Sequence, residues 1–140
     1  MRTALSAIAI VVAAFATAAP AFAAEVEVIS GDTIKVGQNE WRIANIDAPR
    51  LDAKCQAERQ LARLAQAKLA ELLAQGDMQL TPTGENDENE HRMARVQMNG
   101  EDVGEKMLAA KLAQAHGAAR PLCPKDRTFD PDGRLMGGMR

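Results

Sequence analysis

The chain has 140 residues, of which 17 are basic and 19 acidic, so its formal net charge at neutral pH is −2. A slightly acidic chain lacks the broad basic surface that grips nucleic acid, so any site for a polyanion has to be local. Aromatic residues are scarce, with one Trp, three Phe and no Tyr, which excludes an extended platform for stacking unpaired bases.

The first residues have the pattern of a secretory signal. Arg2 precedes an almost wholly apolar run over residues 4–19, and small residues follow at alternate positions. We predict cleavage after Ala23, which leaves 117 residues with 16 basic and 19 acidic side chains, enough for one domain. An uncleaved membrane anchor is the alternative, but the run is short for a span and Pro20 interrupts it. We therefore expect the mature protein in the periplasm or outside the cell, without membrane attachment.

Alternation of polar and apolar residues predicts three strands, over residues 25–29, 33–36 and 41–46. Turn residues separate them, Ser30-Gly31-Asp32 first and Gly37-Gln38-Asn39 second. The third strand would place Arg42 on the same face as Ala44 and Ile46, in a semi-enclosed position.

A long helix is predicted over residues 53–74, with apolar residues at spacings of three and four, and Gly76 ends it. Its core-facing stripe is expected to be Ala57, Leu61, Leu64, Lys68, Leu69 and Leu72. Two further strands are expected over residues 78–83 and 92–98, on either side of a very acidic loop. A second helix is expected to open at Glu101-Asp102.

This order of elements is three strands, a helix, two strands and a helix. It suits a small five-stranded antiparallel barrel with a capping helix after strand three, which is the OB-fold arrangement and makes the class mainly β with α. We expect residues 24–120 to form this domain. Residues 121–140 lack periodicity and are expected to be a mostly disordered tail.

Two cysteines, Cys55 and Cys123, lie in the exported part of the chain. An even number of cysteines in an oxidising compartment favours one disulfide. Two free thiols or a metal pair are the alternatives, and the lack of a neighbouring histidine ligand argues against metal.

Several short motifs occur in a specific order between Glu25 and Arg120. They are Gly31-Asp32-Thr33-Ile34, Trp41-Arg42-Ile43, Ile46-Asp47-Ala48-Pro49, Arg92-Met93-Ala94-Arg95-Val96 and Asn99-Gly100-Glu101-Asp102-Val103. Gly-Asp-Thr alone is common, but the order and spacing of all the motifs together resemble the thermonuclease family, the staphylococcal nuclease-like domains.

That resemblance implies an OB barrel and calcium-dependent hydrolysis of phosphodiesters in DNA and RNA. By position, Asp32, Asp47 and the carbonyl of Ala48 would bind calcium (Ca2+), which takes hard oxygen ligands. Arg42 and Arg92 would clamp the scissile phosphate and stabilise charge in the transition state. The alternative for the two arginines is a set of salt bridges with the aspartates that stabilises the barrel without chemistry.

Three positions depart from the family pattern. Arg50 replaces the acid that activates the attacking water, and a guanidinium cannot act as a base at physiological pH. Ser30 replaces an outer acid near the metal, and His91 replaces a glycine. Loss of a general base typically costs about 10² to 10⁴ in rate. Asp52 and His91 are candidate substitutes, and Asp87 in the acidic loop is a weaker candidate for calcium.

The sequence therefore predicts an exported, monomeric thermonuclease-like protein with reduced calcium-dependent activity on DNA or RNA. The alternative is a catalytically degenerate OB domain that binds nucleic acid or a protein. A third class, a periplasmic binder of another anion or protein, has no residue that points to it.

Overall fold

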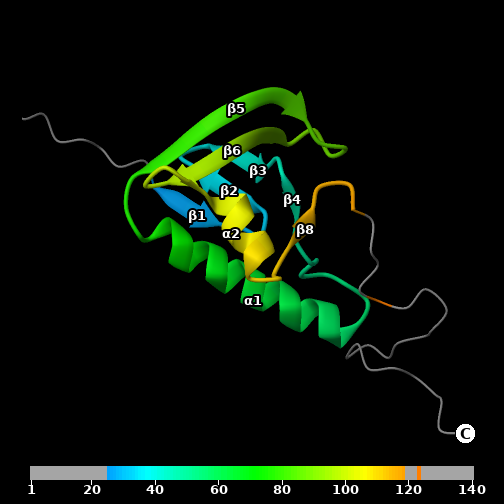
Figure 1. Ribbon diagram of the computed structural model, residues 1–140. Helices are drawn as coiled ribbons and strands as arrows, with labels where there is room; N and C mark the ends of the chain where they lie inside the picture. Colours follow the sequence, from blue (N-terminus) through cyan, green and yellow to red (C-terminus); the bar gives the residue numbers. More distant parts are fainter. Residues whose placement is uncertain (1–24, 119–122, 124–140) are drawn as a thin grey trace, which may run out of the picture.

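The computed structural model describes residues 25–118 and Cys123 (Figure 1). The predicted signal, residues 1–23, and the predicted tail apart from Cys123 lie outside the described residues. The strands are β1 (Val26–Val28), β2 (Thr33–Val36), β3 (Asn39–Ile43), β4 (Ile46–Asp47), β5 (Met78–Asn86), β6 (Arg92–Met98), β7 (Glu101–Asp102) and β8 (Gln114–Ala115). The helices are α1 (Gln56–Leu73) and α2 (Val103–Ala109).

The main sheet has the strand order β1-β2-β3-β6-β5, and β7 adds to β6. All its pairings are antiparallel except that of β3 with β6, which is parallel. The expectation of an entirely antiparallel sheet was therefore wrong at this one pairing, because the chain crosses over through α1 between the third strand and its partner. This strand order, with α1 after the third strand, is that of an OB-fold, and the predicted fold class is confirmed.

The predicted third strand is divided in two. β3 ends at Ile43, the chain turns at Ala44 and Asn45, and β4 then pairs antiparallel with β8. The backbone N–H of His116 donates to the carbonyl of Asn45 at 3.1 Å, which joins the turn to the end of the domain. Because of this break, Asp47 does not continue the strand that carries Arg42. It lies beside His116 and Gly117, which come about seventy positions later in the chain.

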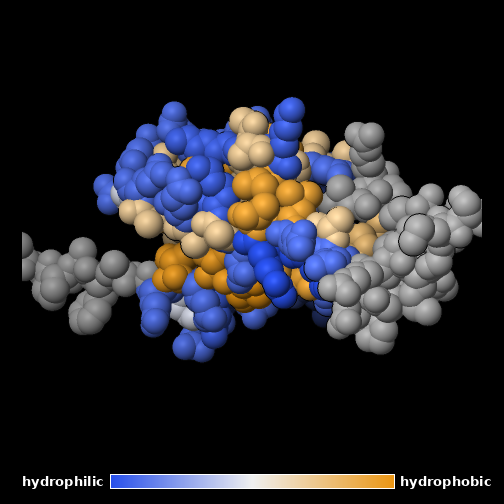
Figure 2. Space-filling view, turned by 90° about the horizontal axis from the view of Figure 1, so that it is seen from below, coloured by the Kyte–Doolittle hydropathy of each residue, from blue (hydrophilic) through white to orange (hydrophobic). Residues whose placement is uncertain are grey.

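The helix α1 lies along one side of the sheet (Figure 1). It begins at Gln56, three residues after the predicted start, and it buries Ala62, Ala65, Leu69 and Leu72. The predicted stripe was partly wrong, because Leu64 is 59% exposed on the outer face. Figure 2 views the molecule from the side of α1 and shows hydrophobic groups interspersed with hydrophilic ones. The alanines on the inner face let the backbone approach closely, which matters for the site described below.

The residues expected to open the second helix instead form β7 and the cap of α2. The side chain of Asp102 accepts a hydrogen bond from the backbone N–H of Glu105 at 3.0 Å, which satisfies a free donor of the first turn. Helix α2 then leads to Lys111 and β8. Within residues 25–118, no helix is long and apolar enough to cross a membrane.

Candidate functional site

The turn before β2 fixes the first predicted metal ligand, Asp32. A Cβ atom on Gly31 would lie 2.6 Å from Cβ of Ala65 and 2.8 Å from Cβ of Ala48, so only glycine fits between α1 and the loop after β4. This close approach brings Ala48 to Asp32, and the Ala48 N–H donates to Oδ2 of Asp32 at 2.8 Å. The hydroxyls of Ser30 and Thr33 donate to Oδ1 at 2.8 and 3.0 Å. Both oxygens of this buried carboxylate therefore accept hydrogen bonds from the protein.

The second predicted metal ligand, Asp47, is held from β4 by the far end of the domain. Its Oδ1 lies 2.9 Å from Nδ1 of His116, and its Oδ2 accepts from the backbone N–H of Gly117 at 2.9 Å. The pairing of β4 with β8 delivers both donors. Burial alone would raise the pKa of Asp47, but these hydrogen bonds, with the charge of Arg42, hold that pKa below its usual range.

Arg42 is the centre of the cluster. Its Nη2 donates to Oδ1 of Asp47 at 2.7 Å and lies 3.6 Å from Oδ2 of Asp32. Its Nη1 donates to Oδ2 of Asp87 at 3.0 Å. The Arg42 side chain is 22% exposed, and its Nε is buried without a hydrogen-bond partner among the described residues. One guanidinium is thus shared by three carboxylates from three different segments.

Asp87 belongs to this cluster rather than to a solvated loop, because its side chain is only 3% exposed. Besides Arg42, it accepts from the backbone N–H groups of Asn89 and His91, and Nδ1 of His91 lies 3.0 Å from its Oδ2. Burial acts to raise the pKa of Asp87, but the hydrogen bonds from His91 and Arg42 outweigh it and hold that pKa far below the usual value.

Both histidines of the chain therefore contact acids that bind Arg42, His91 through Asp87 and His116 through Asp47. Sequence reasoning gave His116 no role and gave Asp87 only a minor one. No local pattern marks either residue, because each meets Arg42 or Asp47 through folding across more than forty positions.

A pocket of about 310 Å³ opens beside this cluster, and Arg42 and Asp47 form part of its wall. Arg50, Glu58 and Lys111 also line it, so the wall holds three cations and two carboxylates. The Arg50 guanidinium binds Asp52 through Nε and Nη2, at 3.0 and 2.9 Å. Both side chains are about three-quarters exposed, which leaves the pair in solvent.

The position expected to hold a water-activating acid is therefore occupied by an ion pair. Asp52, a candidate substitute for that acid, faces Arg50, and this contact lowers the pKa of Asp52. His91, the other candidate substitute, faces Asp87 and Glu40 rather than the pocket lining.

Calcium fits this site in ligand type but not in arrangement. Carboxylate oxygens are the ligands calcium prefers, yet each of the four oxygens of Asp32 and Asp47 already accepts a protein donor. Nη2 of Arg42 lies 2.7 Å from Oδ1 of Asp47 and 3.6 Å from Oδ2 of Asp32, so the guanidinium contacts both carboxylates that would bind the cation. The guanidinium supplies the positive charge that a metal ion would bring.

Arg92 lies apart from this cluster. Trp41 is its partner in the β3–β6 register, whereas Arg42 is opposite Met93, so Arg92 and Arg42 emerge on opposite faces of the sheet. Its Cζ atom lies 5.8 Å from the centre of the Trp41 ring. The structure does not bring the two arginines expected to clamp one phosphate to the same pocket.

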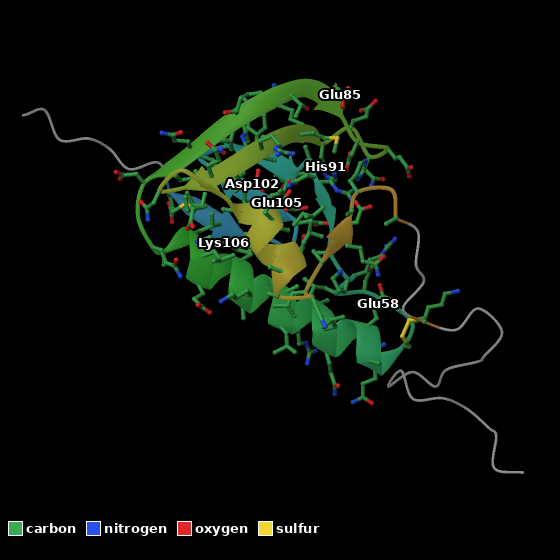
Figure 3. All side chains as sticks on the ribbon, in the orientation of Figure 1. Glu58, Glu85, His91, Asp102, Glu105 and Lys106 are labelled. Atoms are coloured by element: carbon green, nitrogen blue, oxygen red, sulfur yellow. A yellow bond between two sulfur atoms is a disulfide. The ribbon has the colours of Figure 1, made fainter. Side chains whose placement is uncertain are left out.

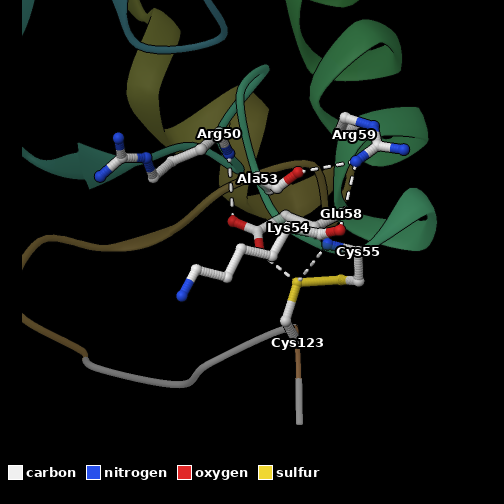
Figure 4. Close-up of a disulfide and its surroundings, with 7 residues drawn as sticks. All are labelled: Arg50, Ala53, Lys54, Cys55, Glu58, Arg59 and Cys123. Carbon is white, nitrogen blue, oxygen red and sulfur yellow. Dashed lines mark hydrogen bonds between the residues drawn. A yellow bond between two sulfur atoms is a disulfide. The ribbon is translucent and has the colours of Figure 1, made fainter. Parts of the chain in front are cut away.

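The predicted disulfide between Cys55 and Cys123 is confirmed (Figure 4). Cys55 precedes α1, so the bridge fastens residue 123 to the first turn of that helix. Glu58 lies between the bridge and the pocket. Its Oε1 accepts from the backbone N–H of Arg50 at 3.2 Å, and its Oε2 lies 3.0 Å from Sγ of Cys123. The bridge therefore lies next to Glu58, whose other carboxylate oxygen binds the backbone of Arg50 at the pocket wall.

The family model described as staphylococcal nuclease homologue matches residues 40–130, which is more than half of the chain. The chain belongs to this family. The match includes the positions of Arg42, Asp47 and Arg50 and begins after Asp32. The family has the OB-fold and makes the protein nuclease-like, with nucleic acid as the class of ligand. No curated protein matches the chain.

Proposed function

We propose that the protein binds a phosphodiester of DNA or RNA in the pocket beside Arg42 and hydrolyses it slowly or not at all. The observation that carries this proposal is the position of Arg50, a permanently charged guanidinium on the pocket wall next to Ala48 and Pro49. The family match supports nucleic acid as the ligand, and the residues of the pocket support slow hydrolysis.

Binding would rest on the three cations of the pocket. Arg50 and Lys111 are exposed, and Arg42 presents part of its guanidinium at the inner wall. Guanidinium groups form paired, charge-assisted hydrogen bonds with phosphate oxygens. With an overall net charge of −2, the protein would hold a nucleic acid through this local site and not through a broad surface.

Hydrolysis would be slow because the described residues of the pocket provide no free base. Among them, only Asp47 and Glu58 supply carboxylates to the wall. Both oxygens of Asp47 accept internal hydrogen bonds, and Glu58 binds the backbone of Arg50. Without a positioned base, proton transfer from the attacking water would lose about 10² to 10⁴ in rate.

Calcium-dependent hydrolysis of DNA or RNA is a second candidate function. It is favoured by the presence of Asp32, Asp47 and Arg42 in one cluster, the residues that the family resemblance assigns to calcium and to phosphate. It requires a cation to compete with Nη2 of Arg42 for the two acids. On either proposal we expect a monomer, and the signal pattern supports action in the periplasm or outside the cell.

Purified exported protein would be tested for binding and cleavage of a fluorescent single-stranded DNA and of an RNA of equal length, in calcium and in chelator. We expect salt-sensitive binding without calcium, and slow or undetectable cleavage with it. Arg42→Ala should weaken binding, and Arg63→Ala, which removes an exposed cation from α1, is the matched control. Rapid calcium-dependent cleavage by the natural chain would favour the second candidate. No binding in any condition would refute both.

A further inference from the structure

A second pocket lies beside Arg92, where β6 begins. Its volume is about 230 Å³, and it is lined by Trp41, Pro82, Gly84, Glu85, Asn86, Arg92 and Met93. Of these residues, none lines the pocket beside Arg42. Figure 3 shows Glu85 at the end of β5, far from Glu58 in the first turn of α1.

An irregularity in strand pairing forms this pocket. β5 and β6 are in regular register from Met78 to Pro82, and the register then shifts before Asn86 pairs with Arg92. Gly84 lies in the shifted segment with φ of +83°. Such bulges bend a strand away from its partner and often re-aim side chains at binding sites. Here the bend leaves a hollow above Trp41, at the point where β6 begins.

Trp41 provides an aromatic wall for the hollow, and it is the one tryptophan of the whole chain. The ring is half-buried and its inner side packs against the core cluster, so its position is fixed. Because Trp41 and Arg92 are partners in a parallel pair, their side chains leave the sheet on the same face.

Arg92 is exposed and weakly bound. Its one hydrogen bond within the described part of the chain is to Oδ1 of Asn39, at a long 3.4 Å. Its guanidinium lies over the Trp41 ring, which stabilises the cation without using its N–H groups. Most of its donors are therefore available to a ligand, in contrast to Arg42, whose Nη1 and Nη2 bind three acids.

We propose that this pocket binds one nucleotide unit, an unpaired base with its phosphate. The base would stack on the outer side of the Arg92 guanidinium, which lies over the Trp41 ring, because guanidinium planes stack on bases. The N–H edge of Arg92 would bind the phosphate, and Glu85 and Asn86 would meet the hydrogen-bonding edge of the base. The ligand class rests on the proposed function, while the pocket itself does not depend on catalysis.

The sole tryptophan makes the test direct, because any change in intrinsic fluorescence comes from Trp41. Exported protein would be titrated with adenosine 5′-monophosphate, with ribose 5-phosphate and with a short single-stranded oligonucleotide. We expect saturable quenching by the mononucleotide with a dissociation constant of about 0.1 to 1 mM, and tighter binding of the oligonucleotide. Ribose phosphate, which has no base, should quench little. Tighter binding of the oligonucleotide would identify a polymer as the preferred source of the nucleotide.

The variants test the assigned contacts. Arg92→Ala should weaken mononucleotide binding about fivefold or more, and Arg92→Lys, which keeps charge but not the planar group, should weaken it less. Arg95→Ala, on the same strand and paired with Asp102, is the matched control and should bind normally. Absence of saturable quenching, equal quenching by ribose phosphate, or equal losses in Arg92→Ala and Arg95→Ala would overturn the proposal.

The Arg42→Ala variant distinguishes the two pockets, because Arg42 lines the first pocket and not the second. If mononucleotide quenching persists in Arg42→Ala while oligonucleotide binding falls, both sites are supported. Quenching without any contribution of Arg42 to oligonucleotide binding would support the second pocket and refute the first. Oligonucleotide binding that needs Arg42, without quenching of Trp41, would refute only the second pocket.

Discussion

Nη2 of Arg42 lies 2.7 Å from Oδ1 of Asp47 and 3.6 Å from Oδ2 of Asp32. The residues that the family resemblance assigns to two roles, binding metal and binding phosphate, are here bound to each other. A phosphate approaching the exposed part of Arg42 therefore competes with three acids for its guanidinium, and a cation approaching Asp47 meets a positive charge. The pairing of Arg42 with the three acids should therefore weaken both phosphate binding and cation binding, and so lower the rate of hydrolysis.

Arg42→Ala should destabilise the fold, because it leaves Asp32, Asp47 and Asp87 close together without their shared cation. Unpairing partly buried charges should cost about 2 kcal/mol, less than for a fully buried pair because Asp47 is one-third exposed. Urea unfolding at pH 7 measures the change. Combining Arg42→Ala with Asp87→Asn should cost less than the sum of the two single losses, and strictly additive losses would contradict the shared contact.

Asp87→Asn should lower stability at neutral pH and matter less in acid. Its pKa in the folded state is far below the unfolded value of about 3.9, so folding favours the ionised carboxylate. This stabilisation is complete above that unfolded pKa and is lost as pH falls toward the folded pKa. The stability difference between the natural chain and Asp87→Asn, measured by denaturant unfolding, should thus be constant from pH 7 to 5 and shrink below pH 4. A difference that grows in acid would contradict this.

His116→Ala should increase calcium affinity. His116 contacts Oδ1 of Asp47, and its removal leaves that oxygen with Nη2 of Arg42 as its remaining partner among the described residues, so less competition opposes a cation. Loss of one such hydrogen bond corresponds to about two- to tenfold in affinity, measurable by calorimetry. His91→Ala is the control, because His91 contacts Asp87 and neither of the two acids assigned to calcium. Equal effects of the two substitutions would show that His116 does not compete with calcium at Asp47.

Reduction of the disulfide should lower thermal stability. Cys55 and Cys123 are 68 positions apart, and a loop of that length corresponds to about 4 kcal/mol in the chain-entropy model. The melting temperature should fall in reductant, and the Cys55→Ser/Cys123→Ser variant should melt at that lower temperature in either condition. An unchanged melting temperature would show that the bridge does not constrain the unfolded chain.

Local sequence patterns predicted the five longer strands, both helices in their order and the pairing of the two cysteines, but not the two-residue strands β4, β7 and β8. They missed the turn at Ala44 and Asn45, because the apolar residues on each side continue the alternation of a single strand. They also missed the approach of His116 to Asp47, which depends on β4 pairing with β8, two residues each. Contacts between such short, distant segments leave no periodic signal in the sequence.

The placement of Arg92 could not be inferred for a different reason. Its distance from Arg42 along the chain is compatible with either face of the sheet, and a shift of one residue in the β3–β6 register exchanges the two faces. The structure pairs Trp41 with Arg92, and this register is what separates the second pocket from the first.

The side chain at position 50 determines whether the pocket wall carries a base that can accept a proton from the attacking water. Initial rates of single-stranded DNA cleavage in calcium would be compared for the natural chain, Arg50→Glu and Arg50→Gln. Arg50→Glu adds a carboxylate that can accept a proton, whereas Arg50→Gln only removes the charge, so we predict a gain of about tenfold or more for Arg50→Glu alone. Equal rates for the natural chain and Arg50→Glu, or an equal gain for Arg50→Gln, would contradict the claim that the missing base limits this protein.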